Sequence, residues 1–125
     1  MILGLGIDLV DVARIDRALK RFGPRFLDRI LCDAEQRHCQ SQPAPAVSVA
    51  ARFAAKEAVS KAFGTGIGAE LGWKDIEVVR LPSGQPSVQL HGAGVELLKS
   101  RGGRNIHLSI THTASHASAV AVIED

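Results

Sequence analysis

Hydrophobic and polar residues recur along the chain with two periods, a helical one in the first half and a strand-like one in the second. An apolar run over residues 2–10 predicts a buried strand, in which Gly4 and Gly6 mark bends. A helix capped by Asp11 is expected next, and Gly23 ends it. Its apolar positions recur at steps of three and four: Val12, Ile15, Leu19 and Phe22.

Helical patterns continue through residue 63. Two short helices are expected over residues 26–31 and 33–40, the second of them capped by Asp33. A longer helix is expected over residues 46–63, because its alanines favour helix strongly, and Gly64 is placed to end it.

The period changes to two after residue 72. Four strands are expected at residues 76–81, 87–90, 105–111 and 117–123, with a short helix at residues 92–101. A turn rich in Pro and Gly joins the first two strands into a hairpin. The elements predict one α+β domain over residues 1–125, in which a mostly antiparallel sheet packs with the long helix.

Composition narrows the class of protein. Aromatic residues make up 4% of the chain and Tyr is absent, so base-stacking surfaces for nucleic acid are not expected. No apolar run is long enough to span a membrane. Cys32 and Cys39 lack the spacing of zinc ligands, and the N-terminus lacks a basic leader region. We therefore expect a cytoplasmic protein with neither nucleic acid nor membrane as a partner.

Positive charge gathers near the N-terminus, although the formal net charge is only +2. Three arginines, Arg14, Arg17 and Arg21, share one face of the predicted helix that begins after Asp11. The stripe suits an acidic partner. A simple solvated helix face is the alternative.

Two carboxylates and a lysine are candidates for chemistry. Glu57 and Lys61 share a helix face, so they could form a surface ion pair of little energetic consequence. Asp8 lies inside an apolar run, where it could cap a turn. If Asp8 and Glu57 met in the fold, they would suit Mg²⁺, which takes one or two carboxylates together with water and substrate phosphate.

A polar strand end is the third candidate. Ser109, Thr111, His112 and Thr113 offer hydroxyls and an imidazole that could bind phosphate, or simply an exposed polar face. The turn at residues 64–66 offers open backbone next to the lysine. His112 and His116 are four residues apart, a spacing that would put both on one face of a helix. The pattern here predicts a strand, so they are not expected to bind zinc.

Taken together, these motifs resemble the holo-acyl-carrier-protein synthases, the small bacterial 4′-phosphopantetheinyl transferases. The resemblance covers essentially the whole chain and lies in five blocks: residues 6–15, 25–31, 52–66, 84–86 and 109–113. It implies a homotrimer of the phosphopantetheinyl transferase fold with active sites shared between subunits. The activity it implies is Mg²⁺-dependent transfer of phosphopantetheine from coenzyme A to a serine of an apo acyl carrier protein, releasing 3′,5′-ADP, in fatty acid or polyketide biosynthesis.

The resemblance also implies roles for single residues. Asp8 and Glu57 would hold the metal and, with Lys61, carry catalysis. Arg14, Arg17 and Arg21 would dock the carrier protein. The residues implied for coenzyme A binding are Arg52, Lys61, Gly64, Thr65, Gly66, Pro86, Ser109, His112 and Thr113. The rival hypotheses are a catalytically silent binding module, which would not require the Asp8, Glu57 and Lys61 set, and a purely structural trimer subunit.

Overall fold

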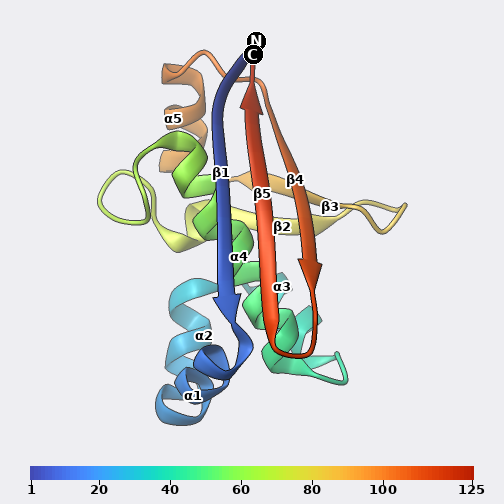
Figure 1. Cartoon of the computed structure of the whole chain (residues 1–125). Helices are drawn as coiled ribbons and strands as arrows, with labels where there is room; N and C mark the ends of the chain where they lie inside the picture. Colours follow the sequence, from blue (N-terminus) through green and yellow to red (C-terminus); the bar gives the residue numbers. More distant parts are fainter.

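A computed structural model describes residues 1–125 (Figure 1). Its elements in chain order are β1 (Ile2–Asp11), α1 (Val12–Phe22), α2 (Pro24–Ile30), α3 (Asp33–Gln40), α4 (Pro45–Phe63), the 3₁₀ turn η1 (Trp73–Asp75), β2 (Ile76–Arg80), β3 (Pro86–Leu90), α5 (Ala93–Ser100), β4 (Asn105–His112) and β5 (His116–Glu124). The predicted helices and strands are confirmed to within a few residues at their ends. The short turn η1 is the one element that the periodicity missed, because three residues are too few to show a period.

The strands form two antiparallel sheets, which confirms the α+β class. β1, β5 and β4 make a three-stranded sheet in the order β1-β5-β4, and β2 pairs with β3 as the predicted hairpin. In Figure 1 the three long strands lie in front of α4, and the hairpin projects beyond them on one side. No helix is long and apolar enough to cross a bilayer.

Helix α4 is the centre of the core, and 13 of its 19 residues are buried. Strand β1 lies directly on it, because Gly4 and Gly6 carry no side chain. A Cβ at Gly4 would stand 1.9 Å from the carbonyl oxygen of Ala62, and one at Gly6 equally close to that of Ala58. The two glycines were expected to bend the strand, and the pairing of β1 with β5 does shift register between Ile2 and Gly4, whereas it continues regularly through Gly6. Their function is close packing of sheet against helix.

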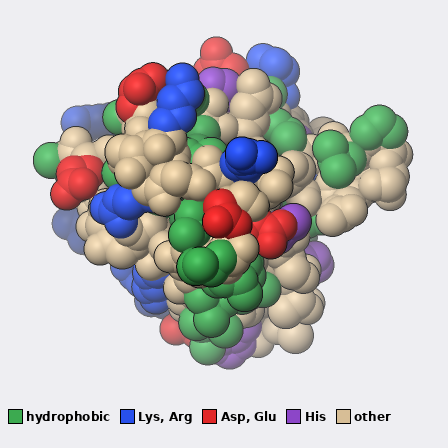
Figure 2. All heavy atoms as spheres, turned by 90° about the horizontal axis from the view of Figure 1, so that it is seen from above, with side chains coloured by type: hydrophobic (Ala, Val, Ile, Leu, Met, Phe, Trp, Pro, Cys, Tyr) green, Lys and Arg blue, Asp and Glu red, His purple; other side chains and the backbone are tan.

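The opposite face of β1 is apolar and open. The exposed fractions of Leu5, Ile7 and Leu9 are 66%, 65% and 68%. The prediction that this strand is buried on both faces is therefore wrong for the single chain, because α4 covers only the face that carries the glycines. Seen from above, hydrophobic side chains gather in a patch from the middle to the lower part of the molecule (Figure 2). Phe22, the last apolar position of the predicted helix before Gly23, is likewise half exposed.

Two predicted helix caps use different atoms from those expected. Asp11 precedes α1, but its carboxylate makes no cap bond and instead lies 2.8 Å from His116 Nε2. Cys32, and not Asp33, is the cap residue of α3, and its N–H donates to Glu35 Oε1 at 2.8 Å. Gly64 ends α4 in the left-handed conformation, as predicted.

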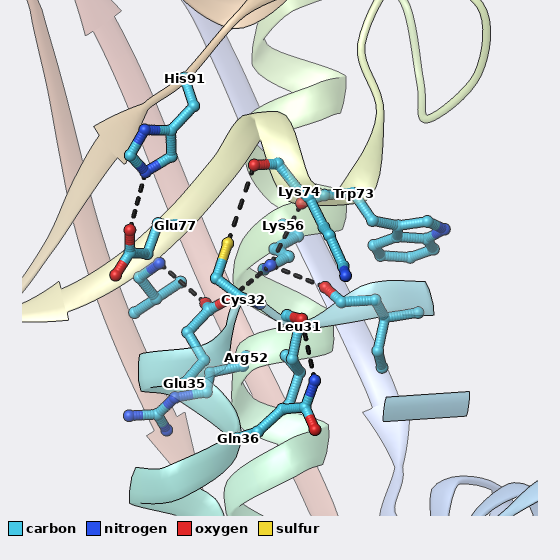
Figure 3. A network of polar contacts seen from close by, with 12 residues as sticks. Leu31, Cys32, Glu35, Gln36, Arg52, Lys56, Trp73, Lys74, Glu77 and His91 are labelled. Atoms are coloured by element: carbon cyan, nitrogen blue, oxygen red, sulfur yellow. Dashed lines mark hydrogen bonds and ion pairs between the residues drawn. The ribbon is translucent and has the colours of Figure 1, made fainter. Parts of the chain in front are cut away.

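A buried ion pair joins α3 to α4 (Figure 3). Lys56 Nζ lies 2.7 Å from Glu35 Oε1, and both side chains are 0% exposed. The ammonium also donates to the carbonyl oxygens of Ile30 and Trp73, while Glu35 Oε2 accepts the N–H of Val78. Every charge in the pair is hydrogen-bonded, which is the condition for burying charges without a large penalty. The network fixes α4 relative to α2, α3 and the hairpin.

Candidate active site

Asp8 and Lys61 make the first contact of the site. Asp8 follows Gly6 on the inner face of β1, so its side chain reaches α4 where the strand lies closest to the helix. Lys61 Nζ donates to Asp8 Oδ1 and to the carbonyl oxygen of Ile7, both at 3.0 Å. No backbone N–H donates to the Asp8 carboxylate, so its interpretation as a capping residue is wrong.

Glu57 is the third member of this group, and its pKa reports its surroundings. Burial raises the pKa of Glu57 most, and the negative charge of Asp8 raises it further, against the lowering effects of Lys61 and Arg14. The predicted surface ion pair of Glu57 with Lys61 does not form, because the lysine pairs with Asp8 instead. We call Asp8, Glu57 and Lys61 the carboxylate–lysine site.

The donor set of this site suits one divalent cation. Two carboxylates close enough for one to raise the pKa of the other leave a repulsion that a cation would relieve. Nowhere do three or more His, Cys, Asp or Glu side chains gather as a complete metal cage. Two carboxylates with open positions for water and phosphate are typical of Mg²⁺.

The turn after α4 is less open than the sequence suggested. Space around Gly64 and Gly66 is free, since an added Cβ would meet nothing within 4 Å. The N–H groups, however, point inward: Gly64 donates to the carbonyl of Lys61, and Thr65 and Gly66 both donate to that of Ser60. A ligand could lie against this turn, but its amides already have acceptors.

A second group of predicted residues lines a cavity of about 380 Å³ between α4, the hairpin and β4. Arg52, Pro86 and His112 meet there, as predicted, and the lining also includes His38, Ser48 and Arg80. We call this pocket the cationic cavity. Neither Arg52 nor Arg80 forms an ion pair with a carboxylate. Unpaired arginines beside histidines make a site for a phosphate or another anion.

Arg52 gives the strongest indication that the cationic cavity can bind an anion. Its residue is only 5% exposed, and its guanidinium donates to Ser48 Oγ at 3.1 Å. Its Nε is buried and has no acceptor. Burial lowers the pKa of His38 most, and the charges of Arg52 and Arg80 lower it further. A buried donor without a partner is costly, so an anionic ligand would stabilise it.

Lys61 and the turn at residues 64–66 lie outside this cavity, and so do two further predicted coenzyme A residues. Ser109 is exposed on the outer face of β4, opposite to Ile110, which lines the cavity. The Thr113 hydroxyl oxygen accepts the N–H groups of Ser115 and His116 in the turn between β4 and β5. Alternation along the strand explains the separation, since neighbouring residues point to opposite faces.

The two groups lie on opposite sides of α4. Five residues separate Arg52 from Glu57, which turns their side chains about 140° apart around the helix axis. The carboxylate–lysine site accordingly opens beside β1, whereas the cationic cavity opens beside β4, with β5 between the two strands. A single chain therefore presents two separate groups of candidate site residues.

The basic face of α1 is confirmed. Arg14, Arg17 and Arg21 are all exposed, and Arg17 and Arg21 border a shallow hollow beside Phe22. The Arg14 guanidinium lies 5.8 Å from the ring centre of Phe53 on α4. Because Arg14 also lowers the pKa of Glu57, the basic face adjoins the carboxylate–lysine site.

A sequence model of the 4′-phosphopantetheinyl transferase superfamily matches residues 4–121. The chain belongs to this superfamily. It is 49% identical to the holo-[acyl-carrier-protein] synthase of Koribacter versatilis over 125 residues, which is all of both chains. It is 45% identical to that of Methylobacterium radiotolerans, covering 99% of this chain and 94% of the relative.

Solved structures of holo-[acyl-carrier-protein] synthases have the same fold as this chain. The holo-[acyl-carrier-protein] synthase of Neisseria meningitidis superposes with a TM-score of 0.94 at 34% identity, over 100% of both chains. That of Helicobacter pylori, solved in complex with coenzyme A, gives 0.86 at 38% identity, over 96% of this chain and 99% of the other. The chain is therefore an enzyme, a phosphopantetheinyl transferase.

Sequence reasoning missed two residues that line the cationic cavity, and it missed the buried position of Lys56. Arg80 stands opposite Pro86 in the hairpin register, so the predicted hairpin could have revealed it. His38 reaches the cavity only through packing of α3 beside α4, for which the sequence has no signal. Lys56 stands beside Glu57 in the motif yet points into the buried ion pair with Glu35.

Proposed function

We propose that this transferase moves 4′-phosphopantetheine from coenzyme A to a serine of an apo acyl carrier protein and releases 3′,5′-ADP. The observation that carries the proposal is the meeting of Asp8, Glu57 and Lys61, which brings two carboxylates and an ammonium together for work on a diphosphate. The named activity of the relatives and the coenzyme A complex of the Helicobacter pylori protein support it.

Mg²⁺ is part of this proposal. Asp8 and Glu57 would hold the ion, which supplies positive charge to the diphosphate of coenzyme A. Lys61, already directed at Asp8, adds a second positive charge for the oxygens that become negative during transfer.

Glu57 is placed to take a proton. Its raised pKa lies closer to neutrality than that of an ordinary glutamate, which suits a general base. The serine oxygen bonds to the β-phosphorus, the bond from that phosphorus to the bridging oxygen breaks, and 3′,5′-ADP leaves. The serine proton goes to Glu57 or to a water that Glu57 holds.

The cationic cavity would receive the phosphorylated nucleotide end of coenzyme A, and a neighbouring subunit would join the two halves of the site. Their position on opposite sides of α4 supports shared sites, and the apolar outer face of β1 offers a surface for subunit contact. The homotrimer expected from the resemblance is the assembly we propose.

The carrier protein would dock on α1. Arg14, Arg17 and Arg21 suit an acidic surface, and the position of Arg14 near Glu57 would bring the acceptor serine close to the reaction. A cytoplasmic location and a role in fatty acid or polyketide biosynthesis belong to the same proposal, and two free thiols suit a reducing compartment.

Intact-mass spectrometry tests the reaction. An apo acyl carrier protein incubated with this protein, coenzyme A and Mg²⁺ should gain one phosphopantetheine, and EDTA should abolish the gain. A folded protein that binds coenzyme A but modifies no carrier would instead favour a binding module.

A further inference from the structure

Three polar side chains form a chain of hydrogen bonds where the sheet meets α1. His116 Nε2 lies 2.8 Å from Asp11 Oδ1, and His116 Nδ1 lies 2.8 Å from Ser115 Oγ. Asp11 is the last residue of β1, and Ser115 and His116 are at the turn from β4 into β5. The chain thus links the end of one edge strand to the turn that leaves the other.

A neutral imidazole satisfies every partner in this chain. Nε2–H donates to the Asp11 carboxylate, and Nδ1 accepts the hydroxyl proton of Ser115. The backbone reinforces the link, because the N–H of Val12 donates to the carbonyl of Ser115 at 2.9 Å. Side chains and backbone therefore hold the first residue of α1 against the same turn.

Asp11 makes this contact in place of a commoner one. An aspartate before a helix usually accepts an N–H of the first turn, yet no such bond forms here. Its carboxylate is directed at His116 instead. The Asp11 carboxylate thus reaches the β4–β5 turn, which directly follows His112 of the cationic cavity. Helix α1, on the other side of this contact, carries Arg14.

We infer that Asp11, His116 and Ser115 are positioning residues, which hold α1 at a fixed place relative to the β4–β5 turn and so keep the carrier-docking face aligned with the carboxylate–lysine site of the same chain. The inference rests on the proposed function. The residues touch neither substrate in this scheme, and they act through the position of α1.

A serine, a histidine and an aspartate in a row also resemble a nucleophilic triad. All three side chains are exposed, however, and a serine nucleophile needs oxyanion donors in a site that excludes water. Their location between two elements of the fold favours positioning.

Steady-state kinetics with the carrier protein and coenzyme A varied separately tests the inference. His116→Ala removes both contacts of the imidazole. Asp11→Ser removes the contact with His116 but supplies a good helix cap, so α1 itself keeps its stability. Each variant should raise KM for the carrier about threefold to tenfold, because it loses one or two exposed hydrogen bonds. The values of kcat and of KM for coenzyme A should stay within about twofold of the wild-type values.

Further variants separate positioning from general damage. His116→Gln, which keeps a donor toward Asp11, should recover most of the carrier affinity. The double variant Asp11→Ser/His116→Ala should be no worse than either single one, because both break the same link. The control is His107→Ala, which removes an equally exposed histidine–carboxylate pair, His107 with Glu124 at 2.6 Å, from the other end of the sheet.

An unchanged KM for the carrier in both His116→Ala and Asp11→Ser would overturn the inference, as would an equal rise in His107→Ala. Absence of any transfer by the unaltered protein would instead contradict the proposed function, so the two failures are distinct.

Discussion

Lys61 Nζ lies 3.0 Å from Asp8 Oδ1, although 53 residues separate the two along the chain. The contact exists because β1 lies against the backbone of α4, which Gly4 and Gly6 permit. The same close approach brings Asp8 within electrostatic reach of Glu57. The geometry of the carboxylate–lysine site therefore depends on two residues that carry no side chain.

Substitution of Gly6 by Ala should destabilise the protein by about 2–3 kcal/mol, because its Cβ would overlap the carbonyl oxygen of Ala58 and push β1 away from α4. Chemical denaturation measures the loss. Gly68→Ala is the matched control, since nothing lies within 4 Å of its added Cβ, and it should change stability by less than about 0.5 kcal/mol. Equal stability of the two variants would contradict the packing argument.

Glu57→Gln should abolish transfer while the protein stays folded. Since the pKa of Glu57 is raised, the metal-free wild type binds more protons folded than unfolded just above pH 4.5, and the stability from this group is lost as the pH rises through the folded pKa. The glutamine side chain of the variant does not ionise, so the variant keeps its stability as the pH rises. Its Tm at neutral pH should therefore exceed the wild-type Tm, and this difference in Tm should vanish in acid. Transfer activity should fall as the pH drops and Glu57 becomes protonated, because the carboxylate is needed ionised.

Thermal shift and the mass assay, each run across pH, check both halves of this prediction. Glu70→Gln, on the exposed loop after α4, is the control and should behave as wild type. A fully active Glu57→Gln protein would exclude both proposed roles of this carboxylate.

Arg52→Ala and Glu57→Gln should complement each other if active sites are shared. Each variant alone should be inactive or nearly so, because each lacks one half of every site. Co-expressed at equal amounts, they should regain up to about one quarter of wild-type activity, the fraction of interfaces that combine two intact halves. Mixed oligomers, verified by native mass spectrometry, that remain inactive would place both halves in one subunit.

Lys56→Met should cost about 3–5 kcal/mol, because it leaves the Glu35 carboxylate buried and unpaired. Glu35→Gln in the same protein should recover part of the loss by removing that charge. Urea denaturation of the single and double variants measures both effects. As a control, Glu96→Ala breaks an exposed pair with Lys99 and should cost less than about 0.5 kcal/mol. A Lys56→Met protein as stable as this control would refute the importance of the buried pair.

Local patterns in the sequence predicted most of the elements. Alanine content and Gly64 define α4, and alternation defines the strands and the hairpin. Residue types that bind phosphate and Mg²⁺, in blocks that resemble one enzyme family, identified the activity. These features can be predicted from the sequence because each depends on residues within a few positions along the chain.

Partners distant in sequence could not be predicted. The pairing of Asp11 with His116 replaced the expected helix cap, and the pairing of Lys61 with Asp8 replaced the expected surface ion pair with Glu57. A carboxylate before a helix can cap it or bind elsewhere, and only the packed chain selects between the two.

By itself, then, the sequence determined the order of helices and strands and the basic face of α1, and it singled out the candidate catalytic residues, because short-range periodicity and side-chain chemistry suffice for these. Only the tertiary structure decided that Asp8 lies beside Lys61 and Glu57 and that the cavity lined by Arg52 lies on the other side of α4. It also decided that one face of β1 stays exposed. Those outcomes depend on how α4 packs against the sheet, and that packing is the sum of many weak contacts between residues far apart along the chain.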